Sequence, residues 1–304
     1  GESRPFYTFQ PLANRLCYVA GLSWENTYIM TIEKLLGLEL SDRTKFIRVI
    51  LLELQRIASH LVWLSAFSAD IGLLTMLVLT FREREYILDL LEHVTGSRMM
   101  YNYLRVGGLK NDLPPGFEED CLRLCDYLEK QFKEYKAILE DSSVFMMRSK
   151  GVGVLSREDA INLGATGPCL RASGVKVDIR KLEPYLVYDK INFEIPVKTS
   201  GDCLARYKIR MAEMFESIKI IRQAIKLLPS EGEISQRYPK KLPDKEVYVR
   251  NEDPRGESAF YIKGNNTAIP YRVKIRSPAY NNLALLPHLL KGQKVADLAA
   301  IVAS

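Results

Sequence analysis

The sequence lacks the cysteine pairs that would hold a metal or build a disulfide framework. No CxxC pair occurs among the 304 residues, and the cysteines are few and scattered. An odd, scattered set is typical of a reducing compartment. Because four thiolates at zinc or iron–sulfur spacing are absent, we expect no metal to be bound by this chain alone. The five cysteines are Cys17, Cys121, Cys125, Cys169 and Cys203.

Nucleotide-binding and nucleophile motifs are also missing. The segment Gly151-Val152-Gly153 is too short for a dinucleotide-binding loop, and the sequence has no GK[ST] phosphate loop. It has no GxSxG nucleophile elbow either. We therefore expect that the chain alone binds no NADH, ATP or flavin.

Long hydrophobic runs and blocks of like charge are absent as well. The longest nearly apolar run covers residues 71–81, whereas a bilayer span needs roughly 20 apolar residues. We expect no membrane-crossing segment and no signal peptide. The net charge of +6 comes without a basic block that interleaves aromatics, which argues against nucleic-acid binding and fits docking on an acidic protein or a membrane surface. The sequence starts with Gly1 and stops mid-pattern at Ser304, so we expect both termini to be incomplete.

Helical periodicity dominates what the sequence does contain. Residues 1–20 are expected to begin as a loop and to enter a helix at about Asn14. From Glu246 the period changes to two, which predicts strands with turns at 253–254 and 264–266. The pattern predicts a mostly α, α+β fold: a long-helix bundle with a small antiparallel sheet. The expected helices cover residues 14–36, 42–67, 81–93, 117–139 and 201–228, and a last one begins near Pro287.

Ionisable residues interrupt the apolar face of the helical stretch 52–114. Glu53, Arg56, His60 and Asp70 lie among apolar residues at helical spacing. Ionisable groups inside apolar helices are costly unless paired, so this cluster suggests a buried polar site or path. A histidine in a helix beside an arginine fits a structural role better than that of a proton carrier.

Four long segments, in one order along the chain, resemble a known family. This family is the hydrogenase-large-subunit-like, quinone-site subunit of respiratory complex I and of archaeal complex-I-like oxidoreductases. The resemblance implies a [NiFe]-hydrogenase large-subunit-like fold for residues 1–304 as one domain. Its sections are the N-terminal helices (1–143), a loop-rich section with a core helix (144–245), and the sheet with the final helix (246–304). The matching segments are Leu52–Pro114, GATGPCLRASGVKVDIRKLEPYLVYDKINFEI, GDCLARYKIRMAEMFESIKII, and the stretch from EVYVRNEDPRGE to the end.

The resemblance also implies a shared function. The chain would be a peripheral-arm subunit on the cytoplasmic, matrix or stromal face of an energy-transducing membrane. With a small subunit that carries a [4Fe–4S] cluster, it would reduce a quinone-type acceptor. Membrane-arm subunits would couple this reaction to ion pumping. The electron donor, whether NAD(P)H, F420H2 or ferredoxin, stays open.

Two residues take catalytic roles in this interpretation. Tyr18 matches the family tyrosine that hydrogen-bonds the quinone headgroup, a task that suits a phenol, which is neutral at pH 7 with a reference pKa of about 10. Asp70 matches the aspartate that pairs with a histidine of an N-terminal HPxxHG segment, which this sequence does not contain. Without the resemblance, Tyr18 would fit a half-buried packing role better. The expected quinone-site or coupling residues are Arg15, Cys17, Arg56, His60 and Arg84.

Three charge patterns allow either a structural or a functional interpretation. The knot Arg82-Glu83-Arg84-Glu85 is either structural ion pairing or a link toward membrane subunits. Arg56, Asp70 and Arg84 could form a charged axis that responds to acceptor reduction. The set Asp202, Arg206 and Arg210 lies at four-residue spacing on one helix face, which favours a ladder of ion pairs.

Hydrogenase activity is not expected. True [NiFe] hydrogenases of this family hold their metals with two CxxC pairs, and at the first pair this chain keeps Cys17 but has Ala20 in the second position. One thiolate cannot supply the four sulfur ligands that hydrogen turnover needs. Two alternatives remain. One is a ferredoxin-linked membrane-bound sulfane-sulfur reductase, which the remaining Cys17 favours, and the other is a non-catalytic scaffold subunit.

Overall fold

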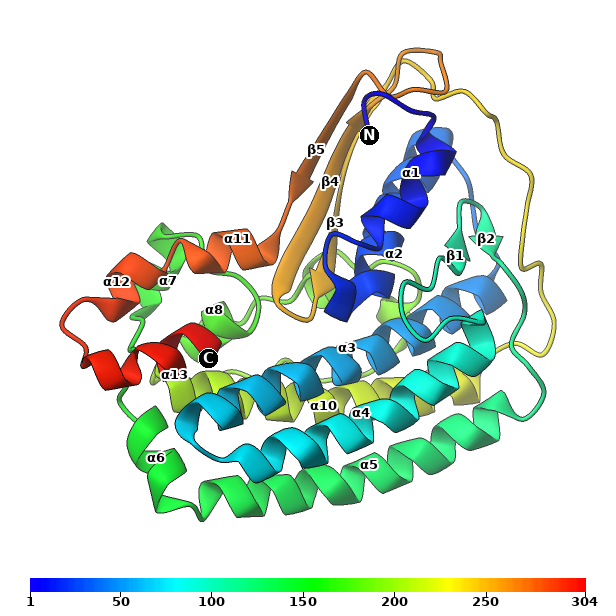
Figure 1. The fold of residues 1–304 in the computed structure, drawn as a ribbon. Helices are drawn as coiled ribbons and strands as arrows, with labels where there is room; N and C mark the ends of the chain where they lie inside the picture. The colour runs from blue at the N-terminus through cyan, green and yellow to red at the C-terminus, as the bar shows by residue number, and fades with distance from the viewer.

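Four long helices form a closed bundle along one side of the molecule (Figure 1). They are α3 (Asp42–Ile71), α4 (Leu74–Thr95), α5 (Phe117–Glu140) and α10 (Cys203–Leu227). Each helix contacts two of the others, in the order α3, α4, α5, α10 and back to α3. The computed structural model describes residues 1–304 and is mostly helical, which confirms the predicted bundle of long helices.

Local sequence sets where the bundle helices begin and end. The Ser41 hydroxyl accepts a hydrogen bond from the Thr44 N–H (3.2 Å) and caps the start of α3. Gly72 ends α3 with φ of 102°, a backbone conformation that glycine adopts without steric cost. Helix α3 therefore ends at Ile71 rather than at the predicted Phe67. Helix α4 begins at Leu74, before the predicted start at Phe81.

Helix α3 is long and apolar enough to span a bilayer by length and composition. Its most apolar window has a mean hydropathy of 1.3, and 83% of that window is buried inside the protein. Burial of this kind is what a core helix shows. Charged residues such as Arg48, Glu53 and Arg56 interrupt this helix, so its sequence contains no uninterrupted apolar run of membrane-spanning length.

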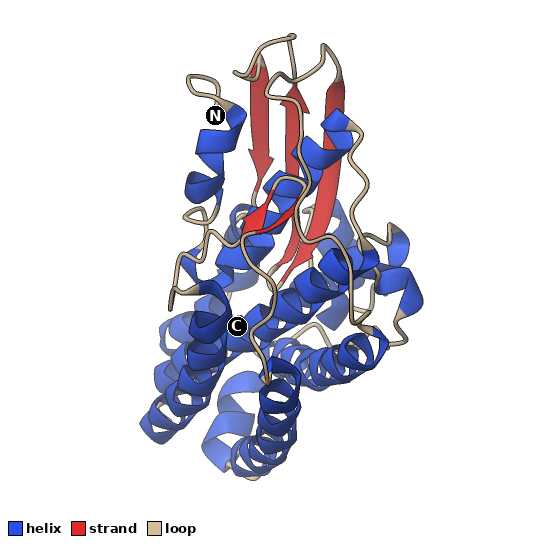
Figure 2. Ribbon diagram, turned by 90° about the vertical axis from the view of Figure 1, so that its right-hand side faces the viewer, coloured by secondary structure: helices blue, strands red, loops and turns tan.

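A three-stranded antiparallel sheet stands across the bundle (Figures 1 and 2). Its strands β3 (Glu246–Asp253), β4 (Gly256–Lys263) and β5 (Arg272–Arg276) are neighbours in that order. Val249 pairs with Phe260, which pairs with Ile275. Helix α2 (Gly21–Leu36) contacts β3 and β4, and Trp24 and Tyr28 meet the Phe260 ring edge-on. The predicted small sheet is confirmed, and the turn expected at 253–254 lies one residue later, at 254–255. A separate two-stranded sheet pairs β1 (Leu104–Arg105) with β2 (Gly108–Leu109).

The N-terminal segment differs from the prediction. A helix from Asn14 was expected, but Asn14 ends α1 (Phe6–Ala13), and η1 (Tyr18–Ala20) then leads into α2. Cys17 is extended, with φ of −148°, and this breaks any continuous helix. In its hydrogen-bonding orientation the Asn14 side-chain oxygen accepts from the N–H groups of Tyr101 and Asn102, both at 3.0 Å. Asn14 thus fixes a distant loop instead of capping a helix.

Short helices fill the rest of the chain. The loop-rich character expected for residues 144–200 is confirmed, whereas the expected final helix is divided into several short pieces. One apolar core joins all three sections of the chain, with members such as Leu61, Phe145 and Phe260. The short helices are α6 (Ser143–Ser149), α7 (Arg157–Asn162), α8 (Pro168–Ala172), α9 (Ile179–Leu182), η2 (Tyr188–Lys190), α11 (Pro278–Leu283), α12 (Leu286–Leu290), η3 (Val295–Asp297) and α13 (Leu298–Ala303).

Candidate functional site

Tyr18 presents its side chain on the outside of a fixed turn. The side chain is 62% exposed, although the next two residues of η1, Val19 and Ala20, are buried. The Gln55 amide of α3 donates to the Val19 carbonyl (3.2 Å) and ties the turn to the bundle. No hydrogen bond within the chain engages the Tyr18 hydroxyl, so it is available to a group from outside.

The two other expected residues of this turn have different environments. Arg15 is exposed and donates to the Pro11 carbonyl. Cys17 is half-buried and receives a hydrogen bond from the Arg255 guanidinium (3.4 Å). Burial raises the pKa of the Cys17 thiol, with Asp253 adding to the effect and Arg255 opposing it. The thiol is therefore protonated at neutral pH and a poor nucleophile.

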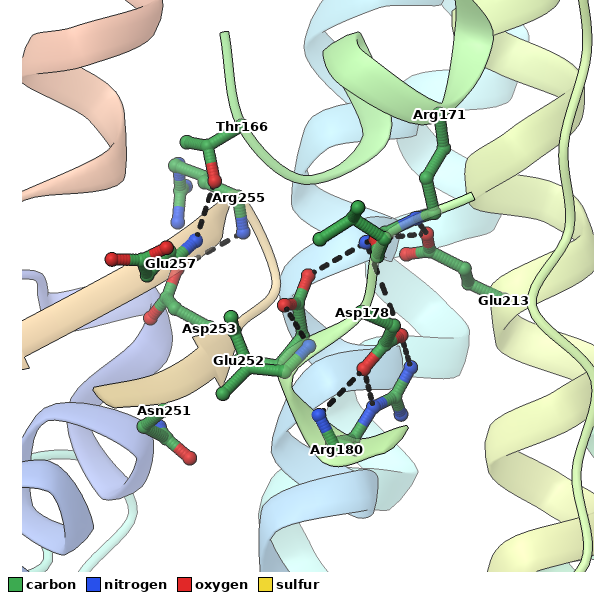
Figure 3. A network of polar contacts seen from close by, with 12 residues as sticks. Thr166, Arg171, Asp178, Arg180, Glu213, Asn251, Glu252, Asp253, Arg255 and Glu257 are labelled. Carbon is green, nitrogen blue, oxygen red and sulfur yellow. Dashed lines mark hydrogen bonds and ion pairs between the residues drawn. The ribbon is translucent and has the colours of Figure 1, made fainter. Parts of the chain in front are cut away.

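The tip of the β3–β4 hairpin carries Arg255 to this turn. Thr166 accepts a hydrogen bond from the Glu257 N–H (2.9 Å), as Figure 3 shows. Next to it, the backbones of Gly167 and Gly256 are so close that a Cβ on Gly167 would lie 2.4 Å from the Gly256 Cα. The absence of a side chain at Gly167 is therefore needed for the hairpin to reach Cys17.

Replacing Gly167 by alanine should lower the free energy of unfolding by about 2 kcal/mol, because a backbone clash adds to the strain of its φ of 63°. Gly151→Ala is the matched control: Gly151 has φ of 71°, but a methyl group there would meet nothing within 4 Å. Urea unfolding of both variants measures the difference. Equal losses would mean that the contact with Gly256 contributes nothing.

A buried ionic network lies beneath the hairpin. Glu53 on α3 accepts hydrogen bonds from four side chains: Arg56 (3.1 Å), Arg180 (3.1 and 3.2 Å), Tyr188 (2.6 Å) and Ser217 (2.6 Å). Its carboxylate is fully buried, so each of these donors offsets part of the cost of removing the charge from water. The complete network comprises Glu53, Arg56, His60, Arg171, Asp178, Arg180, Glu213 and Glu252.

Arg171 connects the other half of the buried ionic network (Figure 3). Its guanidinium pairs with Glu213 of α10 (2.6 Å) and with Glu252 of β3 (2.8 Å). His60 lies on the other side of Glu213, with Nε2 2.9 Å from the carboxylate. Asp178, at the start of α9, pairs with Arg180 (2.7 Å). Elements that are distant in sequence are thus held together by ion pairs.

The protonation states in this network follow from burial and pairing. Burial opposes ionisation of Glu53, but Arg56 and Arg180 outweigh it and lower the pKa to about 2. Burial lowers the pKa of His60 to about 4, against the raising effect of Glu213. Glu213 has a pKa below its usual range because Arg171 outweighs the effect of burial. At pH 7 His60 is therefore neutral, and its Nε2–H donates to the Glu213 carboxylate.

The expected charged axis of Arg56, Asp70 and Arg84 has no continuous contacts in this chain. Arg56 belongs to the buried ionic network, whereas Asp70 is exposed at the end of α3 and makes no hydrogen bond or ion pair. Arg84 is nearly buried beside the Phe81 ring, and its closest acidic partner is Glu85 at 3.9 Å. Arg56 and Asp70 lie at distant positions on α3, and Arg84 lies on α4, so the three side chains do not meet.

Tyr18 and Asp70 are also not joined within the chain. The Tyr18 turn is tied to Gln55, and Asp70 lies fifteen residues further along α3, which corresponds to about 22 Å of helix axis. Asp70 therefore does not reach Tyr18 directly, and any link between the two must pass through other groups.

The expected ladder of Asp202, Arg206 and Arg210 is wrong. Asp202 is the N-cap of α10 and accepts from the Ala205 N–H (2.7 Å), so its carboxylate does not reach Arg206. Within the charge knot, Glu83 is buried and accepts from Tyr135, while Arg82 lies toward solvent. The sequence interpretation missed the partners of the buried ionic network on α8, α9, α10 and β3. No local signal marks these partners, because only tertiary packing brings them together. They are Arg171, Asp178, Arg180, Glu213 and Glu252.

No group of three or more His, Cys, Asp or Glu side chains is placed to hold a metal ion.

Known proteins resemble this chain along its whole length. The family profile "Respiratory-chain NADH dehydrogenase, 49 Kd subunit" matches residues 70–242 and 238–304. Subunits of the NAD(P)H-quinone oxidoreductases of Chaetosphaeridium globosum chloroplasts and of Picosynechococcus sp. are 43% and 44% identical, each covering 100% of this chain and 84% of the relative. A subunit of the NADH-quinone oxidoreductase of Desulforamulus reducens is 43% identical, covering 100% of this chain and 83% of the relative. The chain belongs to the family of the 49 kDa subunit of the respiratory-chain NADH dehydrogenase, a subunit of complex-I-type oxidoreductases.

Proposed function

We propose that this chain forms, together with a small subunit that carries a [4Fe–4S] cluster, the site that reduces a quinone-type acceptor. The observation that carries the proposal is the Tyr18 side chain, which is exposed although the next two residues of the turn, Val19 and Ala20, are buried. The apolar side chains of Tyr7, Leu12 and Leu16 are exposed close to it in sequence. Exposed apolar side chains in this segment support a surface for a partner or ligand.

The chemistry assigned to this chain is proton handling. A quinone takes up two electrons and two protons to become a quinol. The cluster of the neighbouring subunit would supply the electrons, since this chain offers no set of metal ligands. Tyr18 would donate its hydroxyl hydrogen bond to a quinone oxygen and pass on one of the two protons as charge develops there; the second proton, and the one that restores the phenol, would come from solvent. The buried Val19 and Ala20 and the hydrogen bond from Gln55 fix the backbone of the turn that carries the phenol, which favours a defined geometry.

Asp70 is the second catalytic candidate of the proposal. Its carboxylate is exposed and has no partner in this chain, so it can pair with a histidine that another segment or subunit brings to it. Arg15, Cys17, Arg56, His60 and Arg84 remain the candidates for the quinone site or for coupling. His60 is neutral and paired with Glu213, which suits a positioning role.

The wider assembly belongs to the same proposal. We infer a hydrogenase-large-subunit-like single domain, with the sections 1–143, 144–245 and 246–304. The partners would be the cluster-carrying small subunit and other peripheral-arm and membrane-arm subunits, so that membrane contact is made through the complex. The chain would lie on the cytoplasmic, matrix or stromal face of an energy-transducing membrane. Relatives named as chloroplastic subunits are consistent with this placement.

The test is reduction of a quinone analogue by the purified whole complex. Tyr18→Phe should lower kcat/KM for the quinone analogue by roughly a hundredfold, because the phenylalanine ring keeps the shape but removes the proton donor. Tyr280→Phe is the matched control, since Tyr280 is 79% exposed and makes no side-chain hydrogen bond. The control variant should keep the wild-type rate.

The alternatives are separate outcomes of that assay. Wild-type turnover with a sulfane-sulfur acceptor, and none with a quinone, would replace the proposal by the sulfane-sulfur reductase. A Tyr18→Phe complex that assembles and retains full quinone activity would contradict a proton-donating role and support a scaffold function.

A further inference from the structure

Strand β3 forms one edge of the three-stranded sheet (Figure 1). In an edge strand, every second residue turns its N–H and C=O groups away from the sheet. Glu252 is such a residue, because its N–H donates to the Tyr185 hydroxyl (3.3 Å) and its carbonyl accepts from Arg56 (2.6 Å). Since the pattern repeats every two residues, the main-chain groups of Tyr248 and Arg250 also face outward.

The outward main-chain groups of Tyr248 and Arg250 have no partner within the chain. No hydrogen bond from another segment reaches their N–H or C=O groups. Strand β3 is eight residues long and pairs with β4 in an unbroken register, without a bulge. A regular edge of this length invites pairing with a further strand unless something covers it. The edge between Tyr248 and Arg250 is therefore a template for an added strand.

A groove of about 470 Å³ lies at the open edge. Besides Tyr248 and Arg250, its lining comes from the end of α2, the segment that follows α2 and the segment that follows α9. Much of the lining is apolar, with Met30, Leu38 and Leu186 among its members. Strand addition combines these two features, since main-chain hydrogen bonds hold the added strand and a neighbouring hollow receives its alternate side chains.

Two lysines at the groove lack a carboxylate partner of their own. Lys34 and Lys45 both belong to the lining. Lys34 makes no ion pair, and Lys45 lies 4.0 Å from Asp42, which is held more closely by Lys190 at 2.7 Å. Both ammonium groups are thus free to pair with an incoming carboxylate.

The carboxylates of the lining do not balance these lysines. Glu33 and Glu183 are paired with arginines. Glu39 is the lining carboxylate without an ion pair, so one glutamate stands against two lysines. The surplus of positive charge is complementary to an acidic side chain on the ligand.

We propose that the edge of β3 between Tyr248 and Arg250 binds an extended, acidic segment of another subunit of the oxidoreductase as an added strand. The segment pairs its main chain with Tyr248 and Arg250, places an apolar side chain in the groove and brings an Asp or Glu side chain to Lys34 or Lys45. A polypeptide is the occupant because its main chain offers N–H and C=O groups at strand spacing. The family consists of subunits of larger enzymes, which supplies such partners. This inference does not depend on the function proposed for Tyr18.

Hydrogen exchange resolved to single amides tests the strand pairing. In the full chain alone, the amides of Val249 and Asn251 face β4 and should exchange at least about tenfold more slowly than those of Tyr248 and Arg250. In the whole complex, the amides of Tyr248 and Arg250 should become protected by at least about tenfold, so that the alternation disappears. Alternation that persists in the complex would overturn the proposal.

The same measurement separates a partner subunit from other occupants of the edge. Protection of Tyr248 and Arg250 in the full chain alone, at every concentration, would assign the edge to a segment of the chain itself. Protection that rises with the concentration of the full chain would assign it to a second copy. Either result would overturn the proposal, whereas protection in the complex alone upholds it.

Tyr248→Pro removes an outward N–H without touching the hydrogen bonds to β4, a position where a sheet tolerates proline. In the assembled complex this variant should lose the protection of the Arg250 amide by about tenfold. Tyr248→Ala is the matched control, because it removes the same side chain and keeps the N–H. If circular dichroism shows that Tyr248→Pro does not fold, the exchange of the wild-type complex decides. Equal protection of the Arg250 amide in the two folded variants would overturn the proposal.

Charge reversal tests the acidic character of the partner segment. Lys34→Glu combined with Lys45→Glu should speed exchange of the Tyr248 amide in the complex by about threefold or more, with a larger effect at low ionic strength. Lys130→Glu is the matched control, since Lys130 is exposed on α5 and does not line the groove. Equal exchange in the two variants would overturn an acidic segment at this edge.

Discussion

Replacing Arg171 by methionine is expected to lower the free energy of unfolding by about 3–5 kcal/mol. The Arg171 guanidinium is fully buried and pairs with Glu213 and Glu252. Methionine fills a similar volume but leaves these two carboxylates buried without their cation. The cost is therefore the desolvation of an uncompensated charge, in addition to the lost ion pairs. Urea denaturation of the full chain measures the effect.

Arg222→Met is the matched control for this prediction. Arg222 also bridges two carboxylates, those of Asp126 and Glu129, but all three side chains are at least 30% exposed. Exposed ion pairs of this kind contribute only about 0–1 kcal/mol. Similar losses in the two variants would show that burial of the Arg171 network does not determine its contribution.

Acidification is expected to remove about 3 kcal/mol of stability through Glu53 alone, since its pKa is lowered from 4.5 to about 2. A carboxylate whose pKa is lower in the folded state stabilises the fold above the pKa of the unfolded state. This contribution is fully present above about pH 4.5 and is lost as the pH falls toward about 2. The physical cause is that Arg56 and Arg180 outweigh the burial that opposes ionisation.

Glu53→Gln separates this contribution from those of the other carboxylates. The glutamine cannot titrate, so the variant should be less stable at pH 7 but lose less stability between about pH 4.5 and about pH 2 than the wild type. The measurement is the urea midpoint as a function of pH. Parallel pH profiles for the two proteins would mean that Glu53 does not titrate with a lowered pKa.

The sequence predicts those parts of the fold that depend on local periodicity. The helices α5 and α10 lie within a few residues of their expected bounds, because an amphipathic pattern marks α5 and the stop at Pro229 marks the end of α10. The alternation from Glu246 onward predicts the sheet for the same reason. The helix expected from Asn14 is wrong because the Asn14 side chain fixes the Tyr101–Asn102 backbone, a contact with no local signature.

The candidate site is predicted only in part for a related reason. Of the four ionisable residues that indicate a buried polar site, Glu53, Arg56 and His60 are found in one network, whereas Asp70 is exposed. Their partners are invisible in the sequence because 127 positions separate Glu53 from Arg180, and 153 separate His60 from Glu213. Only tertiary packing brings these residues into contact.

The measurement that tests the central claim most directly is a cryo-electron microscopy structure of the whole complex with a quinone analogue bound. The account predicts that the small subunit covers the exposed Tyr18 turn and that the analogue's carbonyl oxygen lies within hydrogen-bond distance of the Tyr18 hydroxyl. An analogue bound elsewhere, with Tyr18 packed against protein and without access to a ligand, would contradict the account.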